Sequence, residues 1–205
     1  DFSVEYVAKE GKNEYVNYFR RLSGRYLEVF TTYPIKINYV GIRPVKYPLE
    51  AKKPHYKSEI RNKIYNVSVR TLSACMHEHY EDTPWREQAL YTMDSRNEML
   101  CTYVAYGDYK FARSSLFLIS LGLRKDGLLS ICYPAGRDIP IPFFSLAYFT
   151  EVYEYVEKSG DTTILTAAFP VLKTMVKTFE SKIESNGLIA DFPYPYWNFY
   201  EWSEG

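Results

Sequence analysis

The pattern of hydrophobic and polar positions changes its period near residue 58. Over residues 1–49, aromatic and β-branched residues form short runs or alternate with polar ones, most clearly at 26–30 and 35–40, which is typical of β-strands. Residues 50–57 are polar and predict a linker. From Ser58, which can cap a helix, apolar residues recur at intervals of three and four and so predict helices. The chain is therefore predicted to begin with β structure and to continue as a helical domain.

The spacing of apolar residues after this change predicts five helices. Their predicted ranges are 58–74, 88–106, 109–123, 143–158 and 162–185. Pro170 is expected to kink the last helix or to start a second one, because proline lacks the N–H that a helix interior needs. Asn186-Gly187 is expected to cap its C-terminus. A long loop rich in Gly and Pro is predicted at 125–142.

A weak internal repeat links two of the predicted helix ends. The stretch 103–108 resembles 155–161 at a spacing of 52 to 53 residues with one gap, and each stretch ends in Gly-Asp. In each copy the glycine can end one helix and the aspartate can cap the next. Two helices in about 50 residues fit stacked or toroidal α-hairpins. The alternative is that Gly-Asp marks two unrelated helix junctions, because this pair is good capping chemistry anywhere.

Composition excludes several classes of protein. Lys plus Arg and Asp plus Glu are both 25, and this neutral balance argues against a nucleic-acid-binding protein and against a polybasic membrane-surface module. No apolar run reaches the ~18 residues of a transmembrane helix. Three cysteines, Cys75, Cys101 and Cys132, are too few for a disulfide scaffold. The chain begins without Met and ends among aromatic residues, so it is expected to be a fragment of a longer protein.

The densest group of polar side chains lies at 75–88, between the first two predicted helices. The candidates for acid–base or binding roles in and just after this stretch are Asp82, Trp85, Arg86, Glu87 and Asp94. Glu87 and Asp94 are about two helical turns apart and would share a face if the helix begins near Arg86. A carboxyl group held near others, or against an indole, has a raised pKa and can donate a proton near neutral pH. The alternative is an ordinary helix start, with Asp82 as the N-cap and Glu87 in the first turn.

The same stretch favours other chemistries less. Cys75, His77 and His79 alternate and could approach one zinc ion from an extended strand, but no second cluster of Cys or His completes such a site. Cys75 near His77 would suit a thiol nucleophile, although neighbours in sequence need not face each other. The sequence contains no serine elbow, phosphate loop or dinucleotide fingerprint. No metal and no cofactor are therefore expected.

Aromatic residues make up 18% of the chain, with 21 Tyr, and they crowd its last segment. Between 192 and 202, Trp197 and Trp202 are interleaved with polar residues such as Asn198 and Glu201. Indole and phenol rings stack on the C–H face of a sugar, while carboxylates and amides bind its hydroxyls. This segment is therefore predicted to bind carbohydrate. The alternative is an aromatic cap buried over the helices.

The polar stretch resembles the signature of bacterial α-L-rhamnosidases of glycoside hydrolase family 78. That signature is an Asp-Cys-Pro-x-Arg-(Asp)-Glu run followed by a further Asp. Asp82, Arg86, Glu87 and Asp94 fall on its positions, and Thr83 replaces the usual Cys.

The resemblance also covers the later part of the chain and implies a fold. The segment 198–202 is similar to the family's F-x-D-W motif, with Glu201 where Asp is common. The family's catalytic domain is an (α/α)6 barrel of six hairpins that follows β-sandwich domains. The implied fold is mainly α: the first half of such a barrel at 58–205, a linker at 50–57, and the C-terminal part of a β-sandwich at 1–49.

The resemblance further implies a role for each site residue. Glu87 would be the general acid that protonates the leaving glycosidic oxygen, and Asp82 and Asp94 would bind rhamnose hydroxyls and tune Glu87. The remaining site residues would line the sugar pocket: Trp85, Arg86, Trp197, Glu201 and Trp202. The family inverts the anomeric centre, so a second carboxylate must activate a water roughly 6.5–9.5 Å from the acid. This base is expected beyond Gly205, and the fragment alone is therefore expected to be inactive.

The sequence thus predicts an inverting α-L-rhamnosidase that acts on terminal rhamnosides in an oligosaccharide, polysaccharide or glycoside. Two alternatives stay open: a non-catalytic carbohydrate-binding module, and another (α/α)6 enzyme such as a polysaccharide lyase or a sugar phosphorylase. A periplasmic or secreted location is favoured over a cytoplasmic one. The linkage and the oligomeric state are left open by these residues.

Overall fold

The computed structural model describes residues 3–136, 138–200 and 202. Its helices are α1 (Glu59–Ala74), α2 (Thr92–Ala105), α3 (Lys110–Leu121), α4 (Pro142–Ser159) and α5 (Leu165–Glu180). Over the described residues no strand is assigned, and β pairing is limited to isolated bridges. The fold is therefore mainly helical, as predicted.

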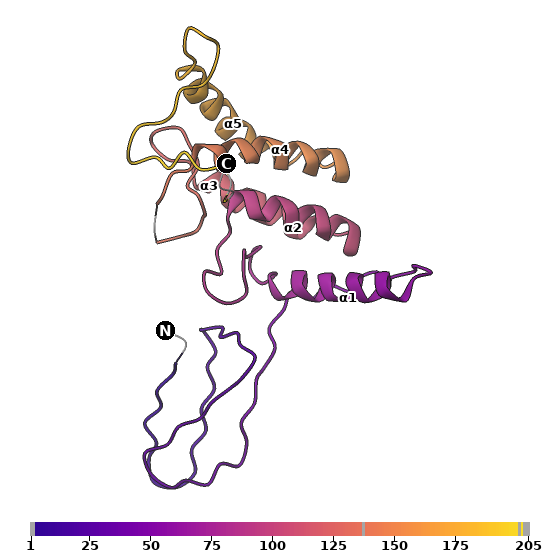
Figure 1. The fold of residues 1–205 in the computed structure, drawn as a ribbon, viewed down its shortest axis with the longest axis vertical. Helices are drawn as coiled ribbons and strands as arrows, with labels where there is room; N and C mark the ends of the chain where they lie inside the picture. The colour runs from indigo at the N-terminus through magenta and orange to yellow at the C-terminus, as the bar shows by residue number, and fades with distance from the viewer. Residues whose placement is uncertain (1–2, 137, 201, 203–205) are drawn as a thin grey trace.

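Helices α2 to α5 form two hairpins that pack side by side. A short turn joins α2 to α3, and another joins α4 to α5. α2 lies against α4 and α3 lies against α5, so each layer contains helices that run in the same direction, and α1 lies against α2. In Figure 1, α1, α2 and α4 run across the view one above another, and the segments that follow α1, α3 and α5 gather at their left ends. Loops 75–91, 122–141 and 181–200 therefore share one end of the bundle, here called the loop end.

Gly-Asp pairs close both hairpins at the opposite end. Gly107 and Gly160 have positive φ angles of 68° and 71°, which glycine adopts without steric cost. The carboxylate of Asp108 accepts a hydrogen bond from a backbone N–H three residues later (3.1 Å), and that of Asp161 accepts one from a backbone N–H two residues later (2.8 Å). The predicted repeat of helix, Gly-Asp turn and helix is confirmed.

A second repeat, which was not predicted, lies at the loop end. Asn186-Gly187 does not cap α5, as was predicted, because that helix ends at Glu180. Gly187, at φ 80°, instead lies in a tight turn closed by a β-bridge, and Gly127, at φ 83°, lies in the same kind of turn 60 residues earlier. In both turns the preceding Asp or Asn side chain accepts a hydrogen bond from the residue after the glycine (3.1 and 2.8 Å). Each hairpin is therefore followed by the same turn.

The bounds of three of the five helices agree closely with the prediction. Those of α1, α3 and α4 lie within two residues of the prediction. α2 begins at Thr92 rather than near residue 88, because 84–87 form a separate turn and Gln88 has a φ of +53°, outside the helical region. α5 begins at Leu165 and continues through Pro170 rather than breaking in two there.

The core lies between the helices and is rich in tyrosine. Tyr80, Tyr148 and Tyr155 are buried. The Tyr148 hydroxyl donates a hydrogen bond to the backbone oxygen of Leu116 (3.0 Å), and the Tyr155 hydroxyl donates one to Asp161 (2.7 Å). Part of the aromatic surplus therefore fills the core. The hydroxyls of Tyr148 and Tyr155 are satisfied there, whereas the buried hydroxyls of Tyr80 and Tyr103 have no hydrogen-bond partner among the described residues. In the described part of the chain, none of the helices has the length and apolar content needed to cross a membrane.

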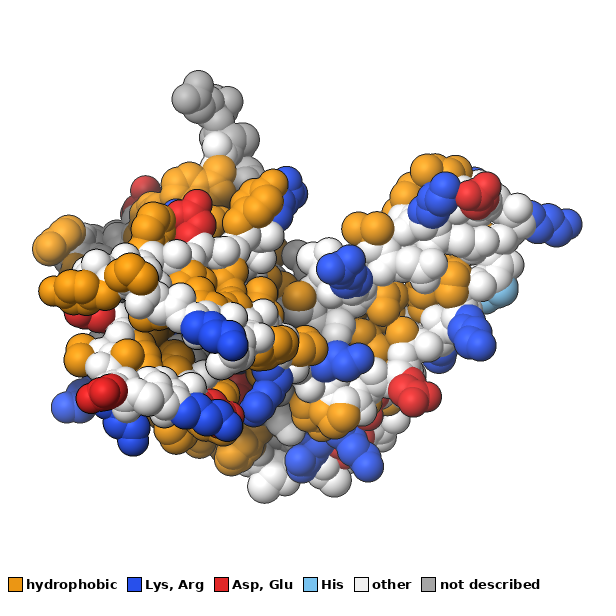
Figure 2. Space-filling view, turned by 90° about the horizontal axis from the view of Figure 1, so that it is seen from below, with side chains coloured by type: hydrophobic (Ala, Val, Ile, Leu, Met, Phe, Trp, Pro, Cys, Tyr) orange, Lys and Arg blue, Asp and Glu red, His pale blue; other side chains and the backbone are white. Residues whose placement is uncertain are grey.

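The segment before α1 is extended chain without paired strands in its described residues, 3–58. The chain turns at Gly11, where the Asn13 side chain bonds to the backbone at Lys9 and Gly11. Many large apolar side chains of this segment are exposed. Figure 2 views the molecule from the side on which the segment lies and shows hydrophobic side chains interspersed with Lys and Arg. The predicted end of a β-sandwich is therefore not confirmed.

The stretch predicted as a linker runs along the helices. The backbone N–H of Lys52 donates a hydrogen bond to the backbone oxygen of Ala105, the last residue of α2 (2.8 Å). The Tyr65 hydroxyl donates one to the backbone oxygen of Lys52 (2.9 Å). These contacts fix the entry of the chain into α1, while the domain bounds at 49 and 58 stay a prediction.

Candidate active site

Loop 75–91, between α1 and α2, carries most of the predicted acid–base residues. The backbone N–H of Asp82 donates a hydrogen bond to the backbone oxygen of Ala89 (3.1 Å), and the carboxylate of Asp82 accepts one from the backbone N–H of Ala89 (2.9 Å). These two bonds close a compact loop that contains Glu87. The alternative in which Asp82 caps a helix is wrong, because α2 begins only at Thr92.

Glu87 is exposed and is held by two hydrogen bonds. The Tyr91 hydroxyl donates to Oε2 (2.8 Å), and the Arg86 guanidinium donates to Oε1 (3.0 Å). These two bonds, led by that from Tyr91, stabilise the charged form and lower the pKa of Glu87. Glu87 is therefore an ionised carboxylate in this structure. The prediction that it shares a helix face with Asp94 is wrong, since Glu87 precedes α2.

Asp82 and Asp94 interact with Glu87 through their charges. Asp94 lies in the first turn of α2. Desolvation raises the pKa of both aspartates, and repulsion from Asp82 raises the pKa of Asp94 further. The charge of Glu87 raises both pKa values as well. The structure thus brings the three predicted carboxyl groups together, although the loop rather than a helix positions Glu87.

Glu98 joins this cluster and was missed by the sequence reasoning. It follows Asp94 by one turn of α2, and its Oε2 is buried with no hydrogen-bond partner among the described residues. Desolvation, followed by repulsion from Asp94 and Asp82, raises the pKa of Glu98 to about 9. Glu98 is therefore a neutral carboxylic acid at neutral pH. The i, i+4 spacing from Asp94 is the sequence signal that could have found it.

Trp85 and Arg86 lie in the turn that leads to Glu87. Both side chains are exposed, Trp85 to 53%. Arg86 forms an ion pair with Glu87 (3.0 Å). The structure places both residues beside the proposed acid, and their contact with a sugar stays a prediction.

His77 and His79 lie against other protein groups, and Cys75 is buried. His79 Nδ1 lies 2.7 Å from the backbone oxygen of Tyr80, and His77 lies beside the buried carboxylate of Glu81 (3.1 Å). Burial raises the pKa of the Cys75 thiol to about 12, which suppresses the reactive thiolate. In the described ranges no group of three or more His, Cys, Asp or Glu side chains has the arrangement of a metal site.

The aromatic residues of the last segment divide into a buried part and an exposed part. Phe192 is buried against Phe179 of α5 (5.9 Å between ring centroids). Trp197, 43% exposed, and Trp202, 78% exposed, lie together with their ring centroids 5.7 Å apart. The backbone N–H of Trp197 donates a hydrogen bond to the backbone oxygen of Pro140 (3.0 Å), which places these rings over the loop that precedes α4. The alternative of an aromatic cap therefore holds for some of these rings, while carbohydrate binding by the exposed rings stays a prediction. The predicted binding residue Glu201 lies outside the described residues.

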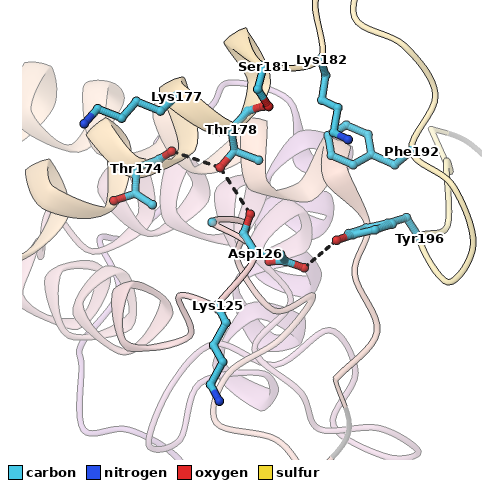
Figure 3. Close-up of a pocket in the computed structure, with 10 residues that line it drawn as sticks. Lys125, Asp126, Thr174, Lys177, Thr178, Ser181, Lys182, Phe192 and Tyr196 are labelled. Carbon is cyan, nitrogen blue, oxygen red and sulfur yellow. Dashed lines mark hydrogen bonds between the residues drawn. The ribbon is translucent and has the colours of Figure 1, made fainter.

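A polar cavity of about 660 Å³ opens elsewhere at the loop end, between the Gly127 turn and α5 (Figure 3). The Tyr196 hydroxyl donates a hydrogen bond to the carboxylate of Asp126 (2.9 Å), and the Thr178 hydroxyl donates one to the backbone oxygen of Asp126 (3.4 Å). These bonds tie the turn to α5 and to the last segment. The lining contains none of the predicted site residues, so the cavity is separate from the carboxyl cluster.

The sequence matches the family model of the bacterial alpha-L-rhamnosidase 6 hairpin glycosidase domain over residues 56–204. The chain belongs to this family. The predicted resemblance to α-L-rhamnosidases is thereby confirmed, and the α2–α3 and α4–α5 hairpins are part of the family's six-hairpin domain. A search among curated proteins finds no match.

Solved rhamnosidase structures share the fold of this rhamnosidase-family chain. The GH78 family rhamnosidase of Bacillus sp. GL1 matches 77% of the chain with a TM-score of 0.70 and 23% identity. The rhamnosidase from Klebsiella oxytoca with rhamnose bound matches 69% of the chain with a TM-score of 0.63 and 24% identity. The chain covers 16% of the first protein and 29% of the second.

Proposed function

We propose that the protein carrying this chain is a glycoside hydrolase that cleaves terminal α-L-rhamnosides with inversion of the anomeric centre. The observation that carries the proposal is the closed loop around Glu87, in which the residues of the family signature meet in one cluster of carboxyl groups. Membership of the rhamnosidase six-hairpin family supports the substrate class.

Glu87 is the proposed general acid. Its carboxylate is exposed, so a glycosidic oxygen can reach it, and it lies within electrostatic range of Asp82 and Asp94. The two aspartates are proposed to bind the hydroxyls of the sugar. Arg86 and the indole of Trp85 are proposed to border the sugar pocket, because they flank Glu87 on the same turn. The exposed rings of Trp197 and Trp202 are proposed to contact a more distant part of the substrate.

The bond from Tyr91 has a mechanistic consequence. An acid must carry a proton, but Tyr91 and Arg86 keep Glu87 ionised. A rhamnoside seated on Glu87 would displace water from the carboxylate, and desolvation raises the pKa of a carboxyl group. We therefore propose that substrate binding raises the pKa of Glu87, which then takes up a proton from the solvent. The neighbouring charges of Asp82 and Asp94 act in the same direction, since like charges disfavour ionisation.

An inverting reaction also needs a carboxylate base. The water it activates lies between two carboxyl groups roughly 6.5–9.5 Å apart. We propose that this base is supplied by another part of the protein, because the chain covers 16% and 29% of two rhamnosidases of its fold. The isolated chain is accordingly proposed to be inactive. Residues 1–49 are proposed to complete a β-sandwich in the whole protein, which is proposed to be periplasmic or secreted.

The test is hydrolysis by the full-length protein of 4-nitrophenyl α-L-rhamnoside, compared with the same aglycone on other sugars. The proposal predicts preferred cleavage of the rhamnoside and β-L-rhamnose as the first product seen by NMR. Release that requires phosphate would indicate a phosphorylase, and an unsaturated product detected in the ultraviolet would indicate a lyase. Binding of rhamnose without turnover would indicate a carbohydrate-binding module. Any of these three results would overturn the proposal.

A further inference from the structure

Arg21 connects the extended N-terminal segment to the loop that carries Glu87. Its guanidinium binds both oxygens of the Glu81 carboxylate: Nη1 donates to Oε2 at 2.9 Å, and Nη2 donates to Oε1. The Glu81 side chain is 0% exposed, and that of Arg21 is 24% exposed. A planar guanidinium that binds both carboxylate oxygens fixes direction as well as charge. Glu81 immediately precedes Asp82, so this pair anchors the start of the closed loop.

The backbone of Arg21 meets the other end of the same loop. The side-chain amide of Gln88 donates hydrogen bonds to the backbone oxygens of Arg21 (3.4 Å) and Pro84 (3.0 Å). Among the described residues, Gln88 is the one non-glycine residue with a positive φ, 53°. Such a conformation is costly for a residue with a side chain and persists only where its surroundings hold it. Gln88 directly follows Glu87, so its backbone sets the direction of the proposed acid.

A second pair of contacts joins the N-terminal segment to the beginning of the loop. His77 Nε2 donates a hydrogen bond to the backbone oxygen of Val45 (3.1 Å), and the backbone N–H of Tyr47 donates one to the backbone oxygen of Met76 (3.0 Å). The segment thus touches the loop at Met76 and His77, at Glu81 and at Gln88.

We propose that Arg21 is a positioning residue for catalysis, which holds Asp82 and Glu87 in place by clamping the residues next to them. This inference rests on the proposed function for its catalytic consequence. Its structural part, that one arginine from outside the helical domain orders the loop, stands independently of that function. Removal of the Arg21 guanidinium takes away the anchor at Glu81 and keeps the backbone acceptor of Gln88. It is expected to loosen the closed loop from its Glu81 end while α2 and α4, whose packing does not involve Arg21, stay intact.

The structural part is tested by hydrogen–deuterium exchange in the full-length protein. Arg21→Gln is expected to speed amide exchange at residues 81–91 at least about tenfold, because an anchored loop exchanges by local opening. Arg25→Gln is the matched control, since Arg25 carries the same charge, is exposed and has no hydrogen bond or ion pair with another described residue. Arg21→Lys, which keeps the charge and loses the fork, is expected to lie between the two. Unchanged exchange at 81–91, or an equal rise over all the helices, would overturn the proposal.

A double variant separates positioning from simple neutralisation of a buried charge. Arg21→Gln leaves Glu81 buried without its cation, which could by itself disturb the fold. Glu81→Gln removes that charge, so Arg21→Gln with Glu81→Gln is expected to melt near the wild-type temperature while the loop still exchanges fast. If the double variant instead restores slow exchange at 81–91, Arg21 only balances a charge and the proposal fails.

Steady-state kinetics tests whether Arg21 positions the catalytic residues, because misplaced groups should change kcat more than KM. Arg21→Gln is expected to lower kcat on an aryl α-L-rhamnoside about ten- to a hundredfold with a smaller change in KM, since misplacing reactive groups acts on the chemical step. Arg25→Gln should leave both unchanged. A full-length wild-type protein without rhamnosidase activity would refute the proposed function, while fast exchange in Arg21→Gln would still support the clamp. A normal kcat together with fast exchange at 81–91 would show that Arg21 orders the loop without affecting catalysis, and would refute its catalytic role.

Discussion

Loop 75–91 and the facing helices α2 and α4 each hold a glutamate, in opposite environments. Glu87, in the loop, is exposed and accepts two hydrogen bonds that lower its pKa. Glu151, on α4, is 1% exposed, and one of its oxygens has no hydrogen-bond partner among the described residues. Ser95 of α2 donates a hydrogen bond to its other oxygen (3.2 Å), and desolvation raises the pKa of Glu151 well above the ordinary value.

Glu98 lies between these two extremes. It shares α2 with Ser95 and is electrostatically coupled to Asp94 and Asp82, yet its buried Oε2 keeps it neutral. Desolvation, and not residue type, therefore decides which acidic side chain can exchange a proton with a substrate. The loop exposes its carboxylate and holds it with hydrogen bonds, whereas the helices bury theirs and keep them protonated. Four predictions test this difference between the two environments.

The largest expected effect is on activity. Glu87→Gln is isosteric and should lower kcat/KM of the full-length protein for an alkyl α-L-rhamnoside by about 10²- to 10⁴-fold, which is the usual contribution of a general acid. Glu98→Gln is the matched control, because a neutral amide replaces a neutral acid, and it should change kcat/KM less than about threefold. Steady-state kinetics of both variants checks this contrast. A comparable loss in the two variants would show that Glu98 also takes part in catalysis, and that burial does not separate its role from that of Glu87.

The second effect is on stability, where the buried glutamate is expected to matter more than the exposed one. Glu151→Ala should lower the free energy of unfolding by about 2–4 kcal/mol, because it leaves a cavity between α2 and α4 and removes one of the two acceptors of the Ser95 hydroxyl. Glu87→Ala, at an exposed position, should change it by less than about 0.5 kcal/mol. Urea unfolding followed by helical circular dichroism measures both. Glu151→Gln, which keeps the volume and the neutral state, should stay within about 1 kcal/mol of wild type. A Glu87→Ala variant less stable than Glu151→Ala would reverse the comparison.

The third effect is the pH dependence of stability. The pKa of Glu98 in the folded state, about 9, lies above the ordinary value of 4.5, so the folded state binds more protons than the unfolded state between these values. The contribution of Glu98 is therefore fully present below pH 4.5 and is lost as pH rises towards 9, by at most about 1.4 kcal/mol per pH unit. Glu98→Gln does not titrate and should make this slope shallower in urea unfolding between pH 5 and 8. An unchanged slope would show that Glu98 is ionised in the folded protein.

The smallest effect concerns the pH profile of activity. Tyr91→Phe removes the hydrogen bond that contributes most to the low pKa of Glu87, so that pKa should rise. An acid loses activity as pH rises through its pKa, and the alkaline limb of kcat/KM should therefore move to higher pH, by less than about one unit. Tyr153→Phe, an exposed ring on α4, is the control and should leave the profile in place. A shift to lower pH would contradict the proton-donor role of Glu87.

The helical part of the fold was largely predictable because local patterns determine it. The apolar period of α1 and the Gly-Asp turns after α2 and α4 depend on neighbours within one or two turns of the chain. The start of α2 was missed for a different reason. The polar run before Tyr91 is compatible with a helix, and only the bonds between Asp82 and Ala89, together with the left-handed Gln88, show that it closes on itself.

The grouping of the three carboxyl groups was predictable, whereas the contacts that support them were not. Asp82, Glu87 and Asp94 lie in one short stretch and come together in the structure, although the helix face predicted for Glu87 and Asp94 was wrong. The pair of Arg21 with Glu81 joins residues 60 positions apart, through a segment whose apolar pattern predicted a strand. No local pattern signals such a contact, because it depends on how the extended segment crosses the loop end. The environment of Glu98 also depends on long-range burial, which the sequence does not display.

The central claim is that Glu87 donates the proton to the leaving group, and leaving-group chemistry tests it most directly. An alkyl rhamnoside needs protonation of its glycosidic oxygen, whereas 2,4-dinitrophenolate is a weak enough base to depart without it. The measurement is kcat/KM of wild type and Glu87→Gln in the full-length protein on these two substrates. The account predicts a loss of about 10³-fold on the alkyl rhamnoside and less than about tenfold on the dinitrophenyl rhamnoside. Equal losses on both substrates would contradict it and would assign the low-pKa carboxylate of Glu87 to the role of base or of a binding group.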